Sequence, residues 1–518
     1  MYGKVMSACL HGVEGKLVEV EVDLSNGLPQ MNIVGLPDSA VKESIERVRA
    51  AIKNCGYTFP LQRITINLAP ADVRKEGSAF DLAIAMGILN TSGQLELEFP
   101  EQILILGELA LDGTVRAIPG VLSMIVSARE QGISRILIPK LNVQEAALIP
   151  DVEIGSLSHM NELQTGITEL FNPTKYLPSK SQPSNFSIPA SNDDFSDVHG
   201  QMQAKRALMI CAAGMHNILL LGPPGTGKTM LVKRLPSILP SMSDQEALEV
   251  TKIYSASGKF ADRSSLIRER PFRMPHHSVS AAGLVGGGSV PKPGEISLAH
   301  RGVLFLDELP EFSRNVLEVL RQPLEERHVT IGRARASYRF PANFIFAASM
   351  NPCPCGYWGA ETAAHACTCS TLKIEHYRSK ISGPLLDRID LQIEVPRIEY
   401  GQIVEKTAQL SSKEIKAHVD RARHIQLKRY QHSSITFNSE LSGTLLKAHC
   451  QLSMEAEQLL QKSFEVLGLS VRAYDRILKI ARTIADLDGS QQLAIPHLAE
   501  ALQYRCLDKK TQSPSHIR

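Results

Sequence analysis

The amino-acid sequence predicts an α/β protein with a nucleotide-binding core and a helical C-terminal part. Residues 219–221 are an apolar run typical of a buried parallel strand, and residues 222–229 after them fit G-x-x-x-x-G-K-[ST]. Further strand patterns at 302–307 and 343–349 are separated by helical segments, as in α/β nucleotide-binding cores. From about residue 411 the apolar spacing is helical only. Together these observations predict the fold class.

The glycine-rich segment predicts a phosphate cradle. Its glycines allow the backbone N–H groups to point at phosphate oxygens, Lys228 can reach the β- and γ-phosphates, and the Thr229 hydroxyl can bind Mg²⁺. The alternative is a Gly/Pro-rich turn with an incidental lysine, which the preceding apolar strand disfavours. The predicted ATP-binding residues of this loop are Gly222, Pro223, Pro224, Gly225, Thr226, Gly227, Lys228 and Thr229.

The length of 518 residues exceeds that of one typical domain. We predict an α/β domain at 1–171, a Pro/Ser/Asn/Lys-rich linker at 172–194, an ATPase core at 195–400 and a helical lid at 401–518. In the first domain, strand patterns at 18–22, 63–68, 103–106 and 135–139 are interspersed with helical spacing at 39–54 and 80–91. In the predicted lid, Ser411 and Glu414 form a capping box, and residues 470–487 have the amphipathic pattern of a helix.

Composition restricts the possible partners and compartment. The net charge is +2, so any nucleic-acid contact must come from local patches. We see no signal peptide and no apolar run of membrane-spanning length, and nine cysteines without an export signal favour reduced thiols. These features predict a cytoplasmic protein with no membrane partner.

Polar residues that follow two core strands predict the rest of an ATPase site. Asp307 would bind Mg²⁺ and Glu308 would polarise the attacking water, while Asn351 could orient that water. Two acids after a strand are common, and the asparagine alone could simply begin the turn before Pro352. Their position downstream of the phosphate loop favours the catalytic interpretation.

Arginines supply candidates for contacts with the γ-phosphate. Arg388 lies between Asp387 and Asp390, where it could reach the nucleotide of a neighbouring subunit or form a surface ion pair with either acid. Arg472, near the start of a lid helix, is a second candidate, and Arg476 one turn later is its rival.

The order of these motifs resembles the AAA+ ATPases, and within them the magnesium-chelatase-like branch and its competence-protein ComM (YifB) family. Segments 197–201, 274–278, 294–300 and 351–356 are similar to that family, and the resemblance covers essentially the whole chain. It implies a hexameric ring, with Arg388 acting in trans and Arg472 sensing nucleotide. It also implies that Val198 borders the adenine.

Two insertions in the core resemble hairpins that project into the pore of such rings. One spans 276–300, and the other, 329–340, alternates like a β-hairpin. Arg333 and Arg335 near its tip would contact DNA phosphates, and Tyr338 would stack on bases. The alternative is a solvated hairpin with ordinary surface arginines.

Four cysteines form the one tight group in the sequence. Cys353, Cys355, Cys367 and Cys369 could close a tetrahedral Zn²⁺ site, although the C-x-C spacing is tighter than usual. The alternative is four reduced loop cysteines.

The N-terminal domain resembles the Lon-protease (S5-like) fold at 75–79 and 107–120. Ser78 lies near the expected nucleophile position, but Leu122 occupies the position of the lysine base. We therefore predict a protease fold without its catalytic dyad.

Three classes of function compete. The family resemblance implies an ATP-driven DNA translocase or helicase that acts on single-stranded and branched DNA, with recombination proteins as further partners. It would promote branch migration during recombination of incoming DNA, that is, in natural transformation. An ATPase subunit of a metal-chelatase complex is the alternative, and the missing lysine argues against an ATP-dependent protease.

Overall fold

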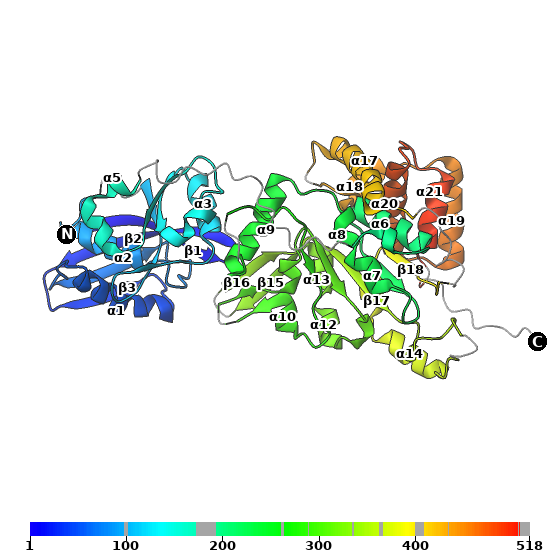
Figure 1. Cartoon of the computed structure of the whole chain (residues 1–518), viewed down its shortest axis with the longest axis horizontal. Helices are drawn as coiled ribbons and strands as arrows, with labels where there is room; N and C mark the ends of the chain where they lie inside the picture. Colours follow the sequence, from blue (N-terminus) through cyan, green and yellow to red (C-terminus); the bar gives the residue numbers. More distant parts are fainter. Residues whose placement is uncertain are drawn as a thin grey trace, which may run out of the picture.

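The computed structural model describes residues 1–97, 102–171, 193–260, 264–288, 290–333, 336–361, 366–398, 409–433, 435–505 and 507. Along the molecule, an N-terminal α/β part, a central α/β part and a C-terminal group of helices follow one another (Figure 1). Nearly all of the predicted linker, 172–192, lies outside the described residues. Within them, no helix combines the length and apolar character needed to cross a membrane.

The N-terminal part is built on a mixed sheet that, among the described residues, has seven strands in the order β3-β4-β2-β1-β5-β8-β9. Apolar clusters cover both of its faces, and the strand and helix segments predicted from the sequence here are confirmed. Its elements are β1 (Tyr2–His11), β2 (Glu14–Ser25), β3 (Gln30–Val34), α1 (Ser39–Asn54), β4 (Arg63–Ala69), α2 (Asp81–Thr91), β5 (Ile103–Ile105), β6 (Glu108–Leu109), β7 (Val115–Arg116), α3 (Val121–Glu130), β8 (Arg135–Pro139), α4 (Val143–Ala146), β9 (Glu153–Leu157) and α5 (Ile167–Leu170).

The central part contains a sheet in the order β11-β14-β17-β10-β18, with every pairing parallel. Alternate side chains of its strands enter two separate apolar clusters, as expected of a parallel sheet covered on both faces. Its elements are α6 (Met202–Gly214), β10 (Ile218–Leu221), α7 (Lys228–Lys233), α8 (Leu235–Ile238), α9 (Asp244–Ser257), β11 (Phe272–Arg273), α10 (Ala281–Val285), β12 (Gly286–Gly287), β13 (Lys292–Pro293), α11 (Glu295–Leu298), β14 (Val303–Leu306), α12 (Arg314–Glu318), α13 (Arg321–Glu326), β15 (His328–Arg333), β16 (Ala336–Pro341), β17 (Ile345–Met350), α14 (Thr371–Ser379), α15 (Gly383–Leu386) and β18 (Leu391–Glu394).

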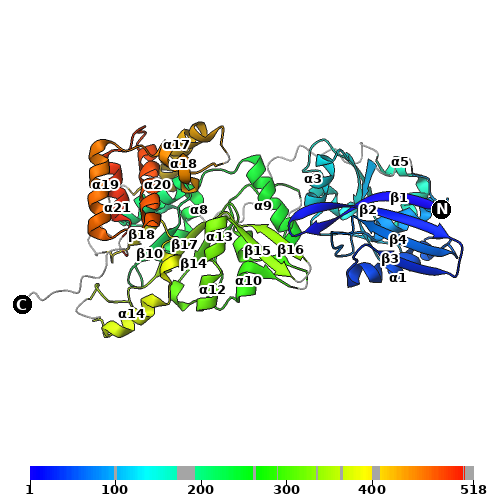
Figure 2. The ribbon, with the colours of Figure 1, turned by 180° about the vertical axis from the view of Figure 1, so that it is seen from behind.

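The C-terminal part is helical, as predicted. It comprises α17 (Ser412–Tyr430), α18 (Gly443–His449), α19 (Met454–Leu467), α20 (Val471–Leu487) and α21 (Ile495–Gln503). The capping box at Ser411 and Glu414 is confirmed at the start of α17. Apolar residues of α17 and α20 share one buried cluster with α6 and the central sheet, so these helices lie over that part of the core (Figures 1 and 2).

Candidate functional site

The central sheet brings the predicted ATPase residues to one edge. β10 ends directly before the phosphate loop, β14 ends before Asp307, and β17 ends before Asn351. β17 lies between β14 and β10, and all three are parallel. Parallel strands present their carboxyl ends at the same edge, which is where ligands bind in open α/β sheets.

The phosphate loop has the backbone form that its glycines allow. Gly225 and Gly227 adopt φ of +79° and +84°, a region that residues with a Cβ rarely enter, and α7 begins at Lys228. At the other end of the loop, Gly222 N donates to Met350 O at 3.2 Å. The loop is therefore anchored to the strand that carries Asn351.

Lys228 connects the loop to Asn351. Its Nζ donates to Gly222 O at 2.7 Å, to Pro223 O at 2.9 Å and to Asn351 Oδ1 at 3.1 Å. Burial lowers the pKa of Lys228, and the nearby acids oppose that shift. The predicted loop lysine and the predicted strand-end asparagine are thus in direct contact.

Asp307 is held by hydroxyl groups from two other elements. Thr229 Oγ1 donates to Asp307 Oδ2 at 2.7 Å, and Ser349 Oγ donates to its other carboxylate oxygen. Sequence reasoning missed Ser349; its only signal was a polar residue near the end of an apolar strand. A P-loop hydroxyl beside a carboxylate is the donor set that holds Mg²⁺ in P-loop ATPases.

Glu308 has an exposed side chain and an unusual backbone conformation. Its φ is +53°, and its N–H donates to Ser349 Oγ at 3.2 Å. Positive φ is uncommon for residues other than glycine and concentrates at functional sites. The turn directs the two consecutive acids differently, with Asp307 bonded inside the site and Glu308 open to solvent.

Arg388 has a partner that the sequence did not reveal. It is 7% exposed, its Nη1 donates to Pro384 O at 2.7 Å, and its Nη2 forms an ion pair with Glu325. The alternative of a surface pair with Asp387 or Asp390 is therefore wrong for its side chain. Its action in trans stays a prediction.

The structure distinguishes the two lid arginines. Arg476 Nη1 forms an ion pair with buried Asp390 and donates to Arg388 O at 3.0 Å. Arg472, one turn earlier on α20, is exposed. Arg476 therefore stabilises the chain next to Arg388, and Arg472 remains the predicted nucleotide sensor.

Val198, predicted to border adenine, is 5% exposed, and its carbonyl accepts a hydrogen bond from Lys205 Nζ at 2.6 Å.

The two predicted hairpins are present as two-stranded antiparallel pairs. β15 pairs with β16 as the alternation predicted, and β12 pairs with β13 within the 276–300 segment. Arg333 is exposed at the end of β15, and its Nη2 donates to Gly288 O at 2.5 Å. The hairpin arginine thus contacts the other insertion. Arg335 lies outside the described residues.

Tyr338 occupies a different environment from the one predicted. It is 2% exposed, its hydroxyl donates to Glu76 Oε1 at 2.9 Å, and its ring stacks on His11 with centroids 4.6 Å apart. Burial, followed by the bond to Glu76, raises its pKa to about 12. The predicted stacking on bases is wrong for this arrangement, because the ring packs against the N-terminal part instead.

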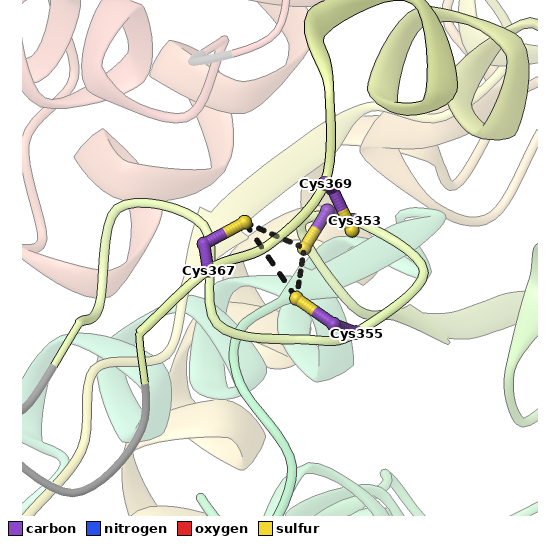
Figure 3. A group of neighbouring side chains, drawn as sticks. All are labelled: Cys353, Cys355, Cys367 and Cys369. Atoms are coloured by element: carbon purple, nitrogen blue, oxygen red, sulfur yellow. Dashed lines mark hydrogen bonds between the residues drawn. The ribbon is translucent and has the colours of Figure 1, made fainter.

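The four predicted metal ligands come together. The Sγ atoms of the four residues all lie within 4.8 Å of one another, and Figure 3 shows their side chains converging on one point: Cys353, Cys355, Cys367 and Cys369. Cys353 is buried and the other three are half-buried. A compact set of four thiols is able to hold a metal ion.

Comparisons with known proteins cover almost the whole chain. Family models match residues 20–142 (subunit ChlI of Mg-chelatase), 194–403 (magnesium chelatase, subunit ChlI) and 409–505 (its C-terminal part). The chain is 45% identical to competence protein ComM of Haemophilus influenzae over 99% of both chains, and 43% identical to YifB of Escherichia coli K12 over 96% of both. The chain belongs to the magnesium-chelatase-like ComM/YifB family.

The chain is also more distantly similar to a magnesium-chelatase subunit. The magnesium-chelatase 38 kDa subunit of Cereibacter sphaeroides is 26% identical over 30% of this chain and 52% of its own. Membership of the magnesium-chelatase-like family implies an ATPase that uses ATP and Mg²⁺. Here the phosphate loop and Lys228 would hold the nucleotide, and Thr229 with Asp307 would hold the Mg²⁺, which supplies charge neutralisation at the phosphates.

In this member of the ComM/YifB family, the residues that resemble a protease site have other partners. Ser78 Oγ donates to a carboxylate oxygen of Glu108, and Lys75 Nζ donates to Pro70 O. Leu122 is fully buried in an apolar cluster. The hydroxyl of Ser78 therefore meets an acid in this structure, and the absence of protease activity stays a prediction.

Proposed function

We propose that the protein is an ATP-driven DNA motor that works as a homohexameric ring in the cytoplasm. It would act as a helicase that migrates branched DNA during homologous recombination of incoming DNA in natural transformation, together with recombination proteins. The observation that carries this proposal is the match to a competence protein over 99% of both chains. The convergent arrangement of Lys228, Asp307 and Asn351 supports hydrolysis as the energy source.

In the ring, Arg388 would stabilise the γ-phosphate of the adjacent subunit, and Arg472 would contact nucleotide from the lid. For Arg388 this requires exchange of its Glu325 partner for a phosphate oxygen, and the Glu325 carboxylate is exposed enough to be solvated when it is released. Within one chain Arg388 is paired with Glu325, so a neighbouring subunit would supply this second positive charge. Assembly would therefore control hydrolysis.

The decisive experiment measures ATP-dependent branch migration on a synthetic four-way DNA junction. The wild-type protein should resolve the junction into its migrated products, and Lys228→Ala should not, because it removes the cation that contacts the loop and Asn351. If the wild type hydrolyses ATP but leaves the junction intact, the motor proposal is wrong.

The second candidate is the ATPase subunit of a metal chelatase, favoured by the partial match to the 38 kDa chelatase subunit. DNA-stimulated ATP hydrolysis separates the two proposals. A motor on DNA should hydrolyse ATP faster when single-stranded or branched DNA is added, whereas a chelatase subunit should not respond.

We predict that the β15–β16 hairpin binds DNA phosphates. Arg333→Ala/Arg335→Ala should weaken binding to a single-stranded oligonucleotide and reduce the slope of log affinity against log salt by about 1 for each phosphate that an arginine neutralises. Fluorescence anisotropy across a salt series measures both quantities. Arg129→Ala/Arg135→Ala, which removes two half-exposed arginines of the N-terminal part, should leave the slope unchanged. Equal slopes for wild type and the hairpin variant would contradict phosphate binding by the hairpin.

Zinc is the proposed metal of the four-cysteine cluster. Four thiolates in a tetrahedral set are the usual structural zinc ligands, and no other residue type contributes to this group within the part of the chain that the structure describes.

A further inference from the structure

The cysteine cluster lies between two elements of the ATPase core. Cys353 and Cys355 follow Asn351 in the turn that leaves β17, and Cys367 and Cys369 precede α14. Arg378 of α14 donates to Pro352 O at 3.2 Å and lies 4.5 Å over the Trp358 ring. The cluster therefore closes a loop whose two ends are both connected to the nucleotide-binding part.

The sulfur positions suit a tetrahedral metal. Cys353 Sγ lies 3.3 Å from Cys355 Sγ and 3.8 Å from Cys367 Sγ, and the latter two are 3.6 Å apart. Four sulfurs each about 2.3 Å from zinc would be about 3.8 Å apart. A disulfide would need about 2.05 Å, so these are separate thiols. Trp358 N also donates to Cys353 Sγ at 3.4 Å, a contact that favours a thiolate.

The turn next to the cysteines packs directly on the phosphate loop. Gly356 has φ of +87°, and a Cβ built there would lie 2.6 Å from Pro224 Cδ and 3.9 Å from Asn351 Cγ. Real Cβ atoms essentially never come this close to another heavy atom, so glycine is what allows the turn and the loop to meet. The proline ring offers little freedom to move aside.

Asn351 provides a second connection from the cluster to the nucleotide. It lies two residues before Cys353, and its Oδ1 accepts from Lys228 Nζ at 3.1 Å. The segment that carries the cysteines therefore contacts the phosphate loop at two places, the Gly356–Pro224 packing contact and the Asn351–Lys228 hydrogen bond.

We propose that zinc bound by the four cysteines is a positioning device for the phosphate loop, so that ATP affinity and turnover depend on zinc occupancy. The inference rests on the proposed ATPase function and deepens it. A structural metal supplies free energy that fixes the shape of the loop that carries its ligands. The ordered loop would then hold Asn351 in position next to Lys228 and keep Gly356 packed against Pro224.

The first test compares zinc content with nucleotide binding. Protein purified without chelators should contain about one zinc per chain, and Cys355→Ser/Cys369→Ser should contain none and bind a fluorescent ATP analogue about tenfold more weakly, the size of a typical coupling between sites. Cys55→Ser is the matched control, because it makes the same change at a cysteine of the N-terminal part. Zinc returned to chelator-treated wild type should restore binding.

The second test separates positioning from stability. Gly356→Ala should keep its zinc and its melting temperature relative to Gly359→Ala, yet lose about tenfold in ATP affinity. Gly359 has φ of +76° in the same loop, and a Cβ there would meet nothing within 4 Å. Alanine therefore strains both backbones similarly, and only Gly356→Ala disturbs Pro224.

The results that would overturn the proposal are distinct from a failure of the motor. Wild-type protein without zinc, or zinc-free protein with unchanged ATP affinity, contradicts it, as does equal ATP affinity of the Gly356→Ala and Gly359→Ala variants. The measurements of zinc content and of ATP affinity do not use DNA. A protein that binds ATP in a zinc-dependent way but fails on the DNA junction would sustain this inference and refute the proposed motor.

Discussion

Replacement of Glu308 by glutamine is expected to lower the ATP hydrolysis rate by about 10²- to 10³-fold while ATP still binds. The side chain keeps its shape, so the αL turn and the hydrogen bond from the Glu308 N–H to Ser349 Oγ should persist. The variant lacks the carboxylate that we predict to polarise the attacking water, and general-base groups contribute rate factors of about this size. Phosphate release measures the rate, and a fluorescent ATP analogue measures binding.

Glu311→Gln is the matched control for this prediction. Glu311 is an exposed acid in the same segment after β14, so its replacement makes the same change in charge. Its hydrolysis rate should remain within about twofold of the wild type, because the exposed Glu311 carboxylate is solvated and screened and is not the predicted general base. A Glu308→Gln protein that hydrolyses ATP as fast as Glu311→Gln would remove Glu308 from the catalytic set.

The sequence was sufficient for the parts of the site that depend on local chemistry. A glycine-rich loop after an apolar strand and two acids after another strand have few alternative explanations once they occur together. Parallel strands then place their ends at one edge, which is why Lys228, Thr229, Asp307 and Asn351 meet as expected. Ser349 was missed because a single hydroxyl in an apolar strand carries no comparable signal.

Predictions that depended on long-range partners were less successful. The alternation in β16 predicted that Tyr338 lies on one face of the hairpin. It did not predict which part of the chain covers that face, because Glu76 is 262 residues away in the sequence. Likewise, Arg388 was compared only with its neighbours in sequence, whereas its carboxylate partner is Glu325 on α13. Periodicity reports which side chains share a face and does not report which part of the chain packs on it.

Asp390→Asn is expected to lower the free energy of unfolding by about 3 kcal/mol, because it leaves Arg476 without its buried anionic partner. Asp390 is 5% exposed, its Oδ2 accepts from Asn217 N at 3.0 Å, and His216 Nδ1 lies 3.4 Å away. Asparagine preserves the size of the side chain. The midpoint of urea unfolding, followed by circular dichroism, measures the decrease.

The effect of Asp390→Asn should also depend on pH in a defined direction. Burial alone would raise the pKa of Asp390, but the Arg476 guanidinium and His216 hold it well below its usual range. A carboxyl whose pKa is lower in the folded state stabilises the protein above its unfolded pKa of about 3.9, and that stabilisation is lost as the pH falls below it. The difference between wild type and variant should therefore shrink as the pH falls below about 4.

Asp387→Asn, a half-exposed acid in the same turn, provides the comparison for both measurements. Its unfolding free energy should change by no more than about 0.5 kcal/mol at any of these pH values, as is usual for surface substitutions. Since Arg476 Nη1 also donates to Arg388 O, removal of the Asp390 carboxylate should disturb the backbone that carries Arg388 as well as the stability. Asp390→Asn protein as stable as Asp387→Asn at pH 7 would show that the ion pair with Arg476 does not stabilise the fold.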